Sequence, residues 1–325
     1  MPQSVPHNHH FIPQFLLRNF LDDKGKIWIY DTTAKTIEAR GTKGAASVED
    51  LYAWNQTDGT TDFQTVEDYF SRLVENDAAK VIRKLLGRGF LSTEEVHHFF
   101  RFVAAQLCRT PAFFSRITES MAPIMQEMCE RMAKHDSGFR ESLTQRLATD
   151  GTTQEQIDEL LSVMGSGGMQ VKPGREFVMQ QGLKMIEEMA RHFSTMRWCF
   201  FDVPANDPDL VIGDHPVTLH DADPASDGRR PIGILSPQVE ILLPLSPRMI
   251  ACARWEGPVS YGELEAGAVV VANQRALRAA QQYIYASHRS ESLLSAAIAE
   301  KALAPKVQVR RVSQGEGLAI VTEYY

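Results

Sequence analysis

The sequence has no long apolar run, and no stretch approaches the roughly 18 consecutive apolar residues that a membrane-spanning helix needs. The N-terminal segment lacks the charged start, apolar centre and cleavage site of a secretory signal. We therefore expect a cytoplasmic protein with no membrane partner. Only four cysteines occur among 325 residues, and none forms a Cys-x-x-Cys pair. This predicts buried free thiols rather than zinc ligands or structural disulfides.

An excess of basic residues is also missing. The chain has 41 acidic and 34 basic residues and a formal net charge of −7, which argues against a broad basic surface for nucleic acid. A nuclease that holds metal ions through carboxylates can still contact phosphates with a small basic cluster. One such cluster is Lys80, Arg83, Lys84 and Arg88, although we favour the plainer interpretation, a solvated helix face. A nucleic acid or nucleotide partner therefore stays open.

The pattern of apolar residues changes once along the chain. Up to about residue 195 it is mostly helical. Thr65 is expected to cap a helix that runs to about Leu86 and ends at Gly87. A second helix begins with a capping box at Ser92 and Glu95, and because it is apolar nearly all round we expect it at the centre of the core. From 198 to 253 it consists of short apolar runs separated by Pro, Gly and Asp, as in a mainly antiparallel sheet whose last two strands form a hairpin at 245–248. Near the N-terminus, 27–30 and 36–40 are expected to form a smaller hairpin, and we expect the N-terminal segment to pack against the main sheet. We predict an α+β fold with a mixed or mainly antiparallel sheet: one domain over 1–325, a helical insertion over 112–195 and the main sheet region over 198–253.

The stretch from Asn8 to Phe20 places polar groups among residues that must be buried. Its apolar residues predict a short helix that opens at Pro13, because proline is tolerated at a first helical position. On that reading, His10 and Gln14 lie one turn apart on one face. His10 is then a candidate acid–base group or metal ligand, and Gln14 a neutral donor to a substrate; a core histidine and a surface amide are the plainer alternatives.

Several short motifs resemble a bacterial family known as domain of unknown function 4238. They are His10-x-x-Pro13-Gln14-x-x-Leu17-x-x-Phe20, Lys26–Asp31, Glu75 before Ala78–Ile82, Gln106-x-x-Arg109-Thr110-Pro111, Ile212–Pro216, Leu243–Pro247, and Asn273 before an Ala-rich helix. The resemblance covers roughly 10 to 290, and the order of the pieces makes it specific. The family more often has Ser-Asp-Asn-Pro where this chain has Gly213-Asp214-His215-Pro216. The resemblance implies positions, among them Asn273 as a ligand contact, and no activity.

Asp214 and His215 follow directly on an apolar strand, at a place where folds often position reactive groups. An adjacent carboxylate and imidazole can serve as a general base with its orienting partner, or as two metal ligands. The alternative is a turn in which Asp214 bonds backbone N–H groups.

Arg109 stands at a helix break before Thr110-Pro111. Its guanidinium could bind a carboxylate or a phosphate through two parallel hydrogen bonds. The alternative is an ion pair with Glu75 that joins two helices. We predict that His10, Arg109 and Asp214 meet in one pocket, because each lies beside apolar segments yet is a residue type that is rarely buried without a partner.

These residues suggest a hydrolase of phosphodiesters or nucleotides, with or without a divalent metal ion. His10, Asp214 and His215 are its candidate catalytic groups, and Gln14, Arg109 and Asn273 its candidate substrate contacts. The competing hypothesis is a non-catalytic ligand-binding or regulatory protein in which the same residues are structural. An enzyme should gather them at a water-accessible site, whereas a structural role should leave them paired in the interior.

Overall fold

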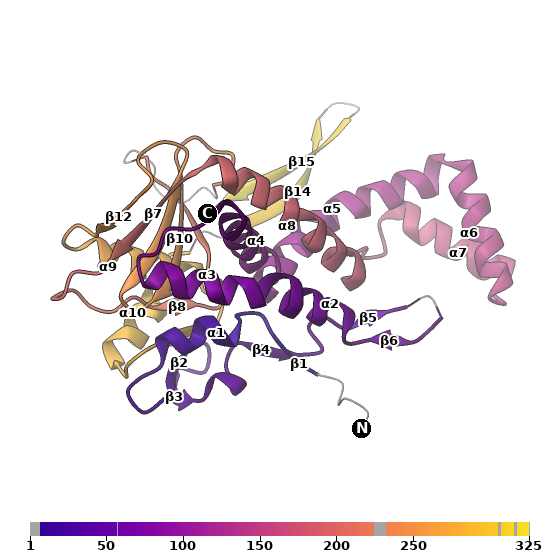
Figure 1. Ribbon diagram of the computed structural model, residues 1–325. Helices are drawn as coiled ribbons and strands as arrows, with labels where there is room; N and C mark the ends of the chain where they lie inside the picture. The colour runs from indigo at the N-terminus through magenta and orange to yellow at the C-terminus, as the bar shows by residue number, and fades with distance from the viewer. Residues whose placement is uncertain (1–6, 57, 224–231, 305–306, 315–316, 325) are drawn as a thin grey trace, which may run out of the picture. The chain divides into compact units, whose positions relative to one another are not determined.

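The computed structural model describes residues 7–56, 58–223, 232–304, 307–314 and 317–324 (Figure 1). It confirms the α+β class, with antiparallel and mixed sheets and many helices. The chain divides into two compact units. The first comprises Met1–Phe114 and Met179–Pro305, and the second comprises Ser115–Val178 and Lys306–Tyr325. Whether the whole chain folds cooperatively as one domain with an insertion over 112–195 stays a prediction.

The helices range from single turns, α1 and α2, to the 25 residues of α5, and two short 3₁₀ segments and one π-helical segment accompany them. Their bounds are α1 Gln14–Leu17, η1 Arg18–Phe20, η2 Thr42–Gly44, α2 Thr65–Asp68, η3 Tyr69–Glu75 (π-helical), α3 Asn76–Leu86, α4 Thr93–Cys108, α5 Pro111–His135, α6 Ser137–Thr149, α7 Gln154–Ser166, α8 Arg175–Thr195, α9 Ala268–Ala279 and α10 Glu291–Ala302. The strands are β1 Asn8–His10, β2 Ile27–Asp31, β3 Thr36–Arg40, β4 Ser47–Glu49, β5 Trp54–Asn55, β6 Thr61–Asp62, β7 Arg197–Asp202, β8 Ile212–Gly213, β9 Thr218–Asp221, β10 Val239–Ser246, β11 Met249–Arg254, β12 Ser260–Glu263, β13 Tyr283–Ala286, β14 Val307–Gln314 and β15 Gly317–Tyr324.

The largest sheet has five strands in the order β12-β7-β11-β10-β9. All its pairs are antiparallel except β12 with β7, and the predicted hairpin joins β10 to β11. Side chains alternate between its faces. Trp198 and Phe200 on one face pack edge to face against Phe99 of α4. On the other face Cys252 lies in a cluster with Val269 of α9. Both faces are therefore buried.

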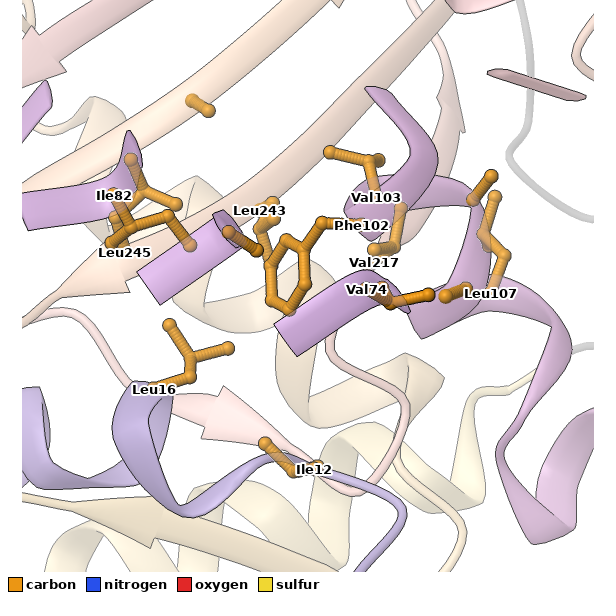
Figure 2. Packing of buried hydrophobic residues seen from close by; sticks show 14 of the residues in the cluster. Ile12, Leu16, Val74, Ile82, Phe102, Val103, Leu107, Val217, Leu243 and Leu245 are labelled. Atoms are coloured by element: carbon orange, nitrogen blue, oxygen red, sulfur yellow. The ribbon is translucent and has the colours of Figure 1, made fainter. Parts of the chain in front are cut away.

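The core of the first unit forms around α3 and α4. The predicted capping box at Ser92 and Glu95 is present and starts α4. Figure 2 shows Phe102 of α4 among apolar side chains from α4, η3 and β10. Burying a phenylalanine of this kind stabilises a fold by roughly 1.5–3 kcal/mol. The sequence was therefore right to place this helix, which is apolar nearly all round, at the centre of the core.

A second sheet of four strands, β3-β2-β13-β8, joins the N-terminal region to the end of the chain. The predicted hairpin of β2 and β3 is confirmed, and β2 also pairs with β13. The N-terminal segment contacts the main sheet as expected, since Asn19 Nδ2 donates to the carbonyl of Leu245 at 2.8 Å. β8 was expected among the strands of the main sheet; it instead pairs with β13 in the second sheet. The stretch that holds Asp214 therefore leaves the main sheet.

Two predicted helix starts are wrong in detail. Pro13 is the residue before α1 rather than its first residue, and His10 belongs to strand β1. Strand pairing of His10 with Ser47 fixes its backbone, so His10 and Gln14 do not share a helix face. Thr65 is the first residue of α2 rather than its cap, and Asp62 accepts the hydrogen bond from its backbone N–H.

The second unit contains most of α5, then α6, α7 and the start of α8, together with the β14–β15 hairpin. Its own apolar cluster is centred on Ala133, Ile157, Leu161 and Met164. The reciprocal capping box at Thr153 and Gln156 starts α7, and Gly167 ends it with φ of 77°. A glycine suits this position because a side chain would strain a left-handed backbone.

Candidate functional site

Arg109 is the centre of a buried polar network. It lies at the end of α4, where Pro111 starts α5, and its side chain has no exposed surface. Its Nη1 donates to Glu75 Oε1 at 2.7 Å, its Nε donates to the Tyr52 hydroxyl at 3.2 Å, and its Nη2 donates to the carbonyl of His10. The ring of Phe70 lies 4.5 Å from the guanidinium carbon. The ion pair with Glu75 that the sequence suggested as the plainer interpretation is therefore present.

The guanidinium of Arg109 stays protonated in this network. Burial alone would lower its pKa, but Tyr52 and Glu75 outweigh burial and raise it. Burial raises the pKa of Tyr52 and keeps the phenol protonated, so its O–H donates to the carbonyl of Arg109 at 3.1 Å. One guanidinium thus joins the ends of α4, η3 and β1. Its geometry is typical of a structural cation that is paired and hydrogen-bonded.

His10 is half-buried beside this network. Burial lowers its pKa, and the backbone groups of Thr42 and Lys43 and the carboxylate of Glu75 oppose that shift. Its Nε2 is buried and has no hydrogen-bond partner among the residues that the structure describes. Gln14 lies close by, because its Oε1 accepts from Thr42 Oγ1 at 3.4 Å. His10 and Gln14 therefore face the same short segment, η2, although they do not share a helix.

Glu67 is a candidate that the sequence reading missed. It lies in α2 directly before the π-helical turn η3, and π-turns are often found at functional sites. Burial is the main cause that raises its pKa to about 7; Arg109 opposes the shift, and Glu75 and Asp68 add to it. Its Oε2 is buried without a partner in the described part of the chain. A glutamate in an amphipathic helix is normally interpreted as a surface residue. Only knowledge that it lies near the buried Arg109 could have identified Glu67 as a candidate.

Gln106 is a second missed residue, although it belongs to the motif that leads to Arg109. It is fully buried, and neither its Oε1 nor its Nε2 has a partner among the described residues. It lies in the last turn of α4, three positions before Arg109, which caps the helix. A fully buried amide without partners is rare in folded proteins.

Asp214 acts as an anchor for the backbone. Its Oδ1 accepts from the backbone N–H of Gln281 at 2.7 Å, and its Oδ2 accepts from Gln282 at 2.7 Å and Tyr283 at 2.9 Å. Burial raises its pKa, while these three N–H groups lower it. Gly213 is required beside it, because a Cβ there would lie 3.1 Å from that of Ala280. Asp214 therefore joins the end of β8 to the start of β13.

His215 connects this anchor to the Arg109 segment. Its Nδ1 lies 3.2 Å from the hydroxyl of Thr110, and both residues are buried. Arg109 thus contacts the backbone of His10, and the next residue contacts the neighbour of Asp214. The carboxylate of Asp214 itself points to backbone groups of 281–283. The shared pocket of His10, Arg109 and Asp214 stays a prediction.

Asn273 of α9 binds the loop that leads into β8. Its Oδ1 accepts from the backbone N–H of Val211 at 3.0 Å, and its Nδ2 donates to the carbonyl of Asp209 at 2.9 Å. Both ends of the amide are therefore occupied by protein. This geometry fits a structural contact between α9 and the loop before β8 better than a substrate contact.

The basic cluster at the end of α3 is largely neutralised by acidic neighbours. Lys80 pairs with Asp77 at 2.9 Å, Lys84 pairs with Glu95 at 2.7 Å, and Arg88 pairs with Asp202. Exposed pairs of this kind add little stability, but they do reduce the local positive potential. The cluster therefore gives little support to a phosphate-binding surface.

Within the described ranges no group of three or more His, Cys, Asp and Glu side chains is arranged to hold a metal ion. The same part of the chain contains no helix that is both long and apolar enough to cross a membrane.

A family model described as "Protein of unknown function (DUF4238)" matches residues 8–290. The chain belongs to this family. The match confirms the resemblance that the short motifs suggested, and it contains every candidate residue named above. Neither the curated proteins nor the solved structures contain a match. Family membership therefore identifies residues but no activity, so a function can be inferred only from the geometry of the site.

Proposed function

We propose that the protein is a hydrolase in which Glu67 and His10 transfer protons beside the buried Arg109–Glu75 ion pair. The observation that supports this most is the order of two pKa values. A glutamate ordinarily ionises near 4.5 and a histidine near 6.5, whereas here the pKa of Glu67 rises to about 7 and that of His10 falls. Environments that push pKa values in this way mark acid–base assignments.

The reversed order has a direct chemical meaning. Near neutral pH a neutral imidazole and a protonated carboxyl group can be present together. The imidazole can take a proton from an attacking water, and the carboxyl group can give a proton to a leaving group. His10 Nε2 and Glu67 Oε2 are buried without partners in the described chain, while both residues keep some contact with solvent. Both also lie within electrostatic range of Arg109 and Glu75.

In this proposal the other candidate residues take supporting roles. Arg109 holds the carbonyl of His10 and thereby positions its imidazole. Asp214, His215 and Asn273 fix the segments around the site through the contacts described above. A phosphodiester or nucleotide substrate remains part of the proposal. The support for it is weaker than the sequence suggested, because the guanidinium of Arg109 already pairs with Glu75 and is not free to bind a phosphate.

The competing proposal is a non-catalytic ligand-binding or regulatory protein. One observation favours it: Arg109 and Asp214, two of the three residues predicted to form a pocket, bind protein groups in the interior. Under this proposal Glu67 and His10 would contact a ligand without chemistry.

A hydrolysis assay separates the two proposals. The full chain is incubated between pH 5 and 9 with bis-p-nitrophenyl phosphate, p-nitrophenyl phosphate, p-nitrophenyl acetate and ATP, with and without Mg²⁺. We expect hydrolysis of at least one substrate near neutral pH, and a loss of about 10²–10⁴-fold in Glu67→Gln and in His10→Gln. Glu188→Gln and His97→Gln, at exposed positions of α8 and α4, are matched controls that should retain activity.

Two results would contradict the hydrolase proposal. One is the absence of hydrolysis above the buffer rate with all four substrates. The other is activity that both site variants retain. In either case a shift of the melting temperature by the same compounds, lost in the site variants and kept in the controls, would support the binding proposal.

A further inference from the structure

Cys199 and Cys252 lie directly opposite each other on neighbouring antiparallel strands. The register of β7 and β11 pairs Cys199 with Cys252, and all four cysteines are free thiols in the structure. Residues that face each other in this way point to the same side of the sheet, with Cα atoms roughly 4.5 or 5.5 Å apart. Disulfides span Cα distances of about 4.4–6.8 Å. The register therefore places the two residues within the Cα range of a disulfide, and rotation of both side chains would bring the two sulfur atoms together.

The surroundings give the two thiols different properties. Cys199 Sγ donates to the carbonyl of Pro258 at 3.0 Å and lies 3.9 Å from the hydroxyl of Ser260 on the edge strand β12. Cys252 Sγ donates to Glu240 Oε1 at 3.5 Å. Burial and the Glu240 carboxylate raise the pKa of Cys252 and keep it a thiol. Cys199 is as buried as Cys252, each with 8% of its surface exposed, but it lies beside the four-residue edge strand β12, and fraying of that strand would expose it first.

We propose that Cys199 and Cys252 form a cross-strand dithiol that peroxides oxidise to a disulfide. The Cys199 thiolate attacks one oxygen of hydrogen peroxide, the O–O bond breaks, and hydroxide leaves to become water. Cys252 Sγ then attacks the sulfenic sulfur of Cys199, the S–O bond breaks, and a second water leaves with the thiol proton. Two thiols lose two electrons and two protons, and one peroxide becomes two waters.

The bridge would connect the two strands that carry the middle of the main sheet. It would also end the hydrogen bond from Cys252 to Glu240, a carboxylate that Arg254 and Arg275 continue to hold. Because a cross-link reduces the freedom of the unfolded chain, the oxidised form should resist urea better than the reduced form. The site is independent of Glu67 and His10, so its test does not depend on the proposed hydrolase.

The test uses the native full chain treated with hydrogen peroxide. Free thiols are alkylated with N-ethylmaleimide under denaturing conditions, and the digest is mapped by mass spectrometry without reduction. We expect the number of alkylated cysteines to fall from four to two, a cross-linked peptide that contains Cys199 and Cys252, and its loss after dithiothreitol. Cys129→Ser, in the second unit, should still form the cross-link.

A variant that lacks the second thiol tests the order of steps. In Cys252→Ser, dimedone should label the sulfenic acid of Cys199, because no neighbouring thiol removes it. Alkylation of all four cysteines in the peroxide-treated native chain would overturn the proposal. A bridge that includes Cys108 or Cys129, or dimedone on Cys199 in the native chain, would overturn it as well. The native chain alone decides the question if the variant does not fold.

Discussion

Replacing Glu67 with glutamine should make the protein more stable at alkaline pH and leave it nearly unchanged at acidic pH. Glutamine has the shape of a protonated glutamate and cannot ionise. In the unfolded chain Glu67 ionises near its ordinary pKa of 4.5, whereas in the folded protein its pKa is about 7. Between these values the folded protein keeps a proton that the unfolded chain has released. The free energy of unfolding therefore falls as pH rises from about 4.5 to 7 and levels off above it.

The size of this effect follows from the shift. One pKa unit corresponds to about 1.36 kcal/mol, so the full shift would be worth roughly 3 kcal/mol. Glu67 keeps partial contact with solvent, which screens its interactions, and we expect about 2 kcal/mol. The variant should therefore exceed the native protein in stability by about 2 kcal/mol at pH 8, and by much less at pH 5.

Urea unfolding, followed by tryptophan fluorescence, measures this difference in the first structural unit, which contains Glu67. All four tryptophans, at positions 28, 54, 198 and 255, lie in the first unit. At each pH, the difference between the free energies of unfolding of the two proteins removes the contribution of every other titrating group. Glu188→Gln, an exposed change on α8, should show no pH-dependent difference. A Glu67→Gln variant that is less stable at pH 8, or a difference that does not change with pH, would refute the reasoning.

Three further substitutions test the network around Glu67, each by urea unfolding in the same fluorescence assay. Arg109→Met should cost about 3–5 kcal/mol because it leaves Glu75 without its cation; a loss below 1 kcal/mol would contradict the structural role. Asp214→Asn should cost about 2–3 kcal/mol, since both carboxylate oxygens accept backbone N–H groups and an amide NH₂ cannot; an unchanged free energy of unfolding would contradict this anchoring role. Gln106→Met should stabilise the protein by about 1 kcal/mol, because it removes a buried amide that has no partner among the described residues; a loss of similar size would show that the amide is satisfied.

The sequence predicted the elements whose signals are local. The capping box at Ser92, the hairpin of β2 and β3 and the apolar faces of α3 and α4 each depend on residues within a few positions of one another. The interaction of Arg109 with Glu75 was also available as an alternative, since a buried arginine needs an anion.

The sequence could not predict features that depend on distant pairing. The main-sheet assignment of the stretch before Asp214 failed because β8 pairs with β13, about 70 residues later. His10 was expected near a helix, but its pairing with Ser47 places it in a strand. Glu67 was missed because its pKa depends on the burial that the whole fold imposes and on Arg109, 42 positions away. None of these partners is visible in a local pattern.

The polar residues of the candidate site differ in whether protein groups satisfy their hydrogen-bonding atoms, and this difference bears on function. Arg109, Asp214 and Asn273 have their hydrogen-bonding atoms occupied by protein groups, so they hold segments in place. His10 and Glu67 each have a buried polar atom without a partner in the part of the chain that the structure describes, and burial shifts their pKa values in opposite directions. Such groups reduce stability, and folded proteins usually avoid them unless they serve a purpose. The contrast between satisfied supporting residues and unsatisfied central ones is what the proposed function rests on, and it makes Glu67 and His10 the positions to test first.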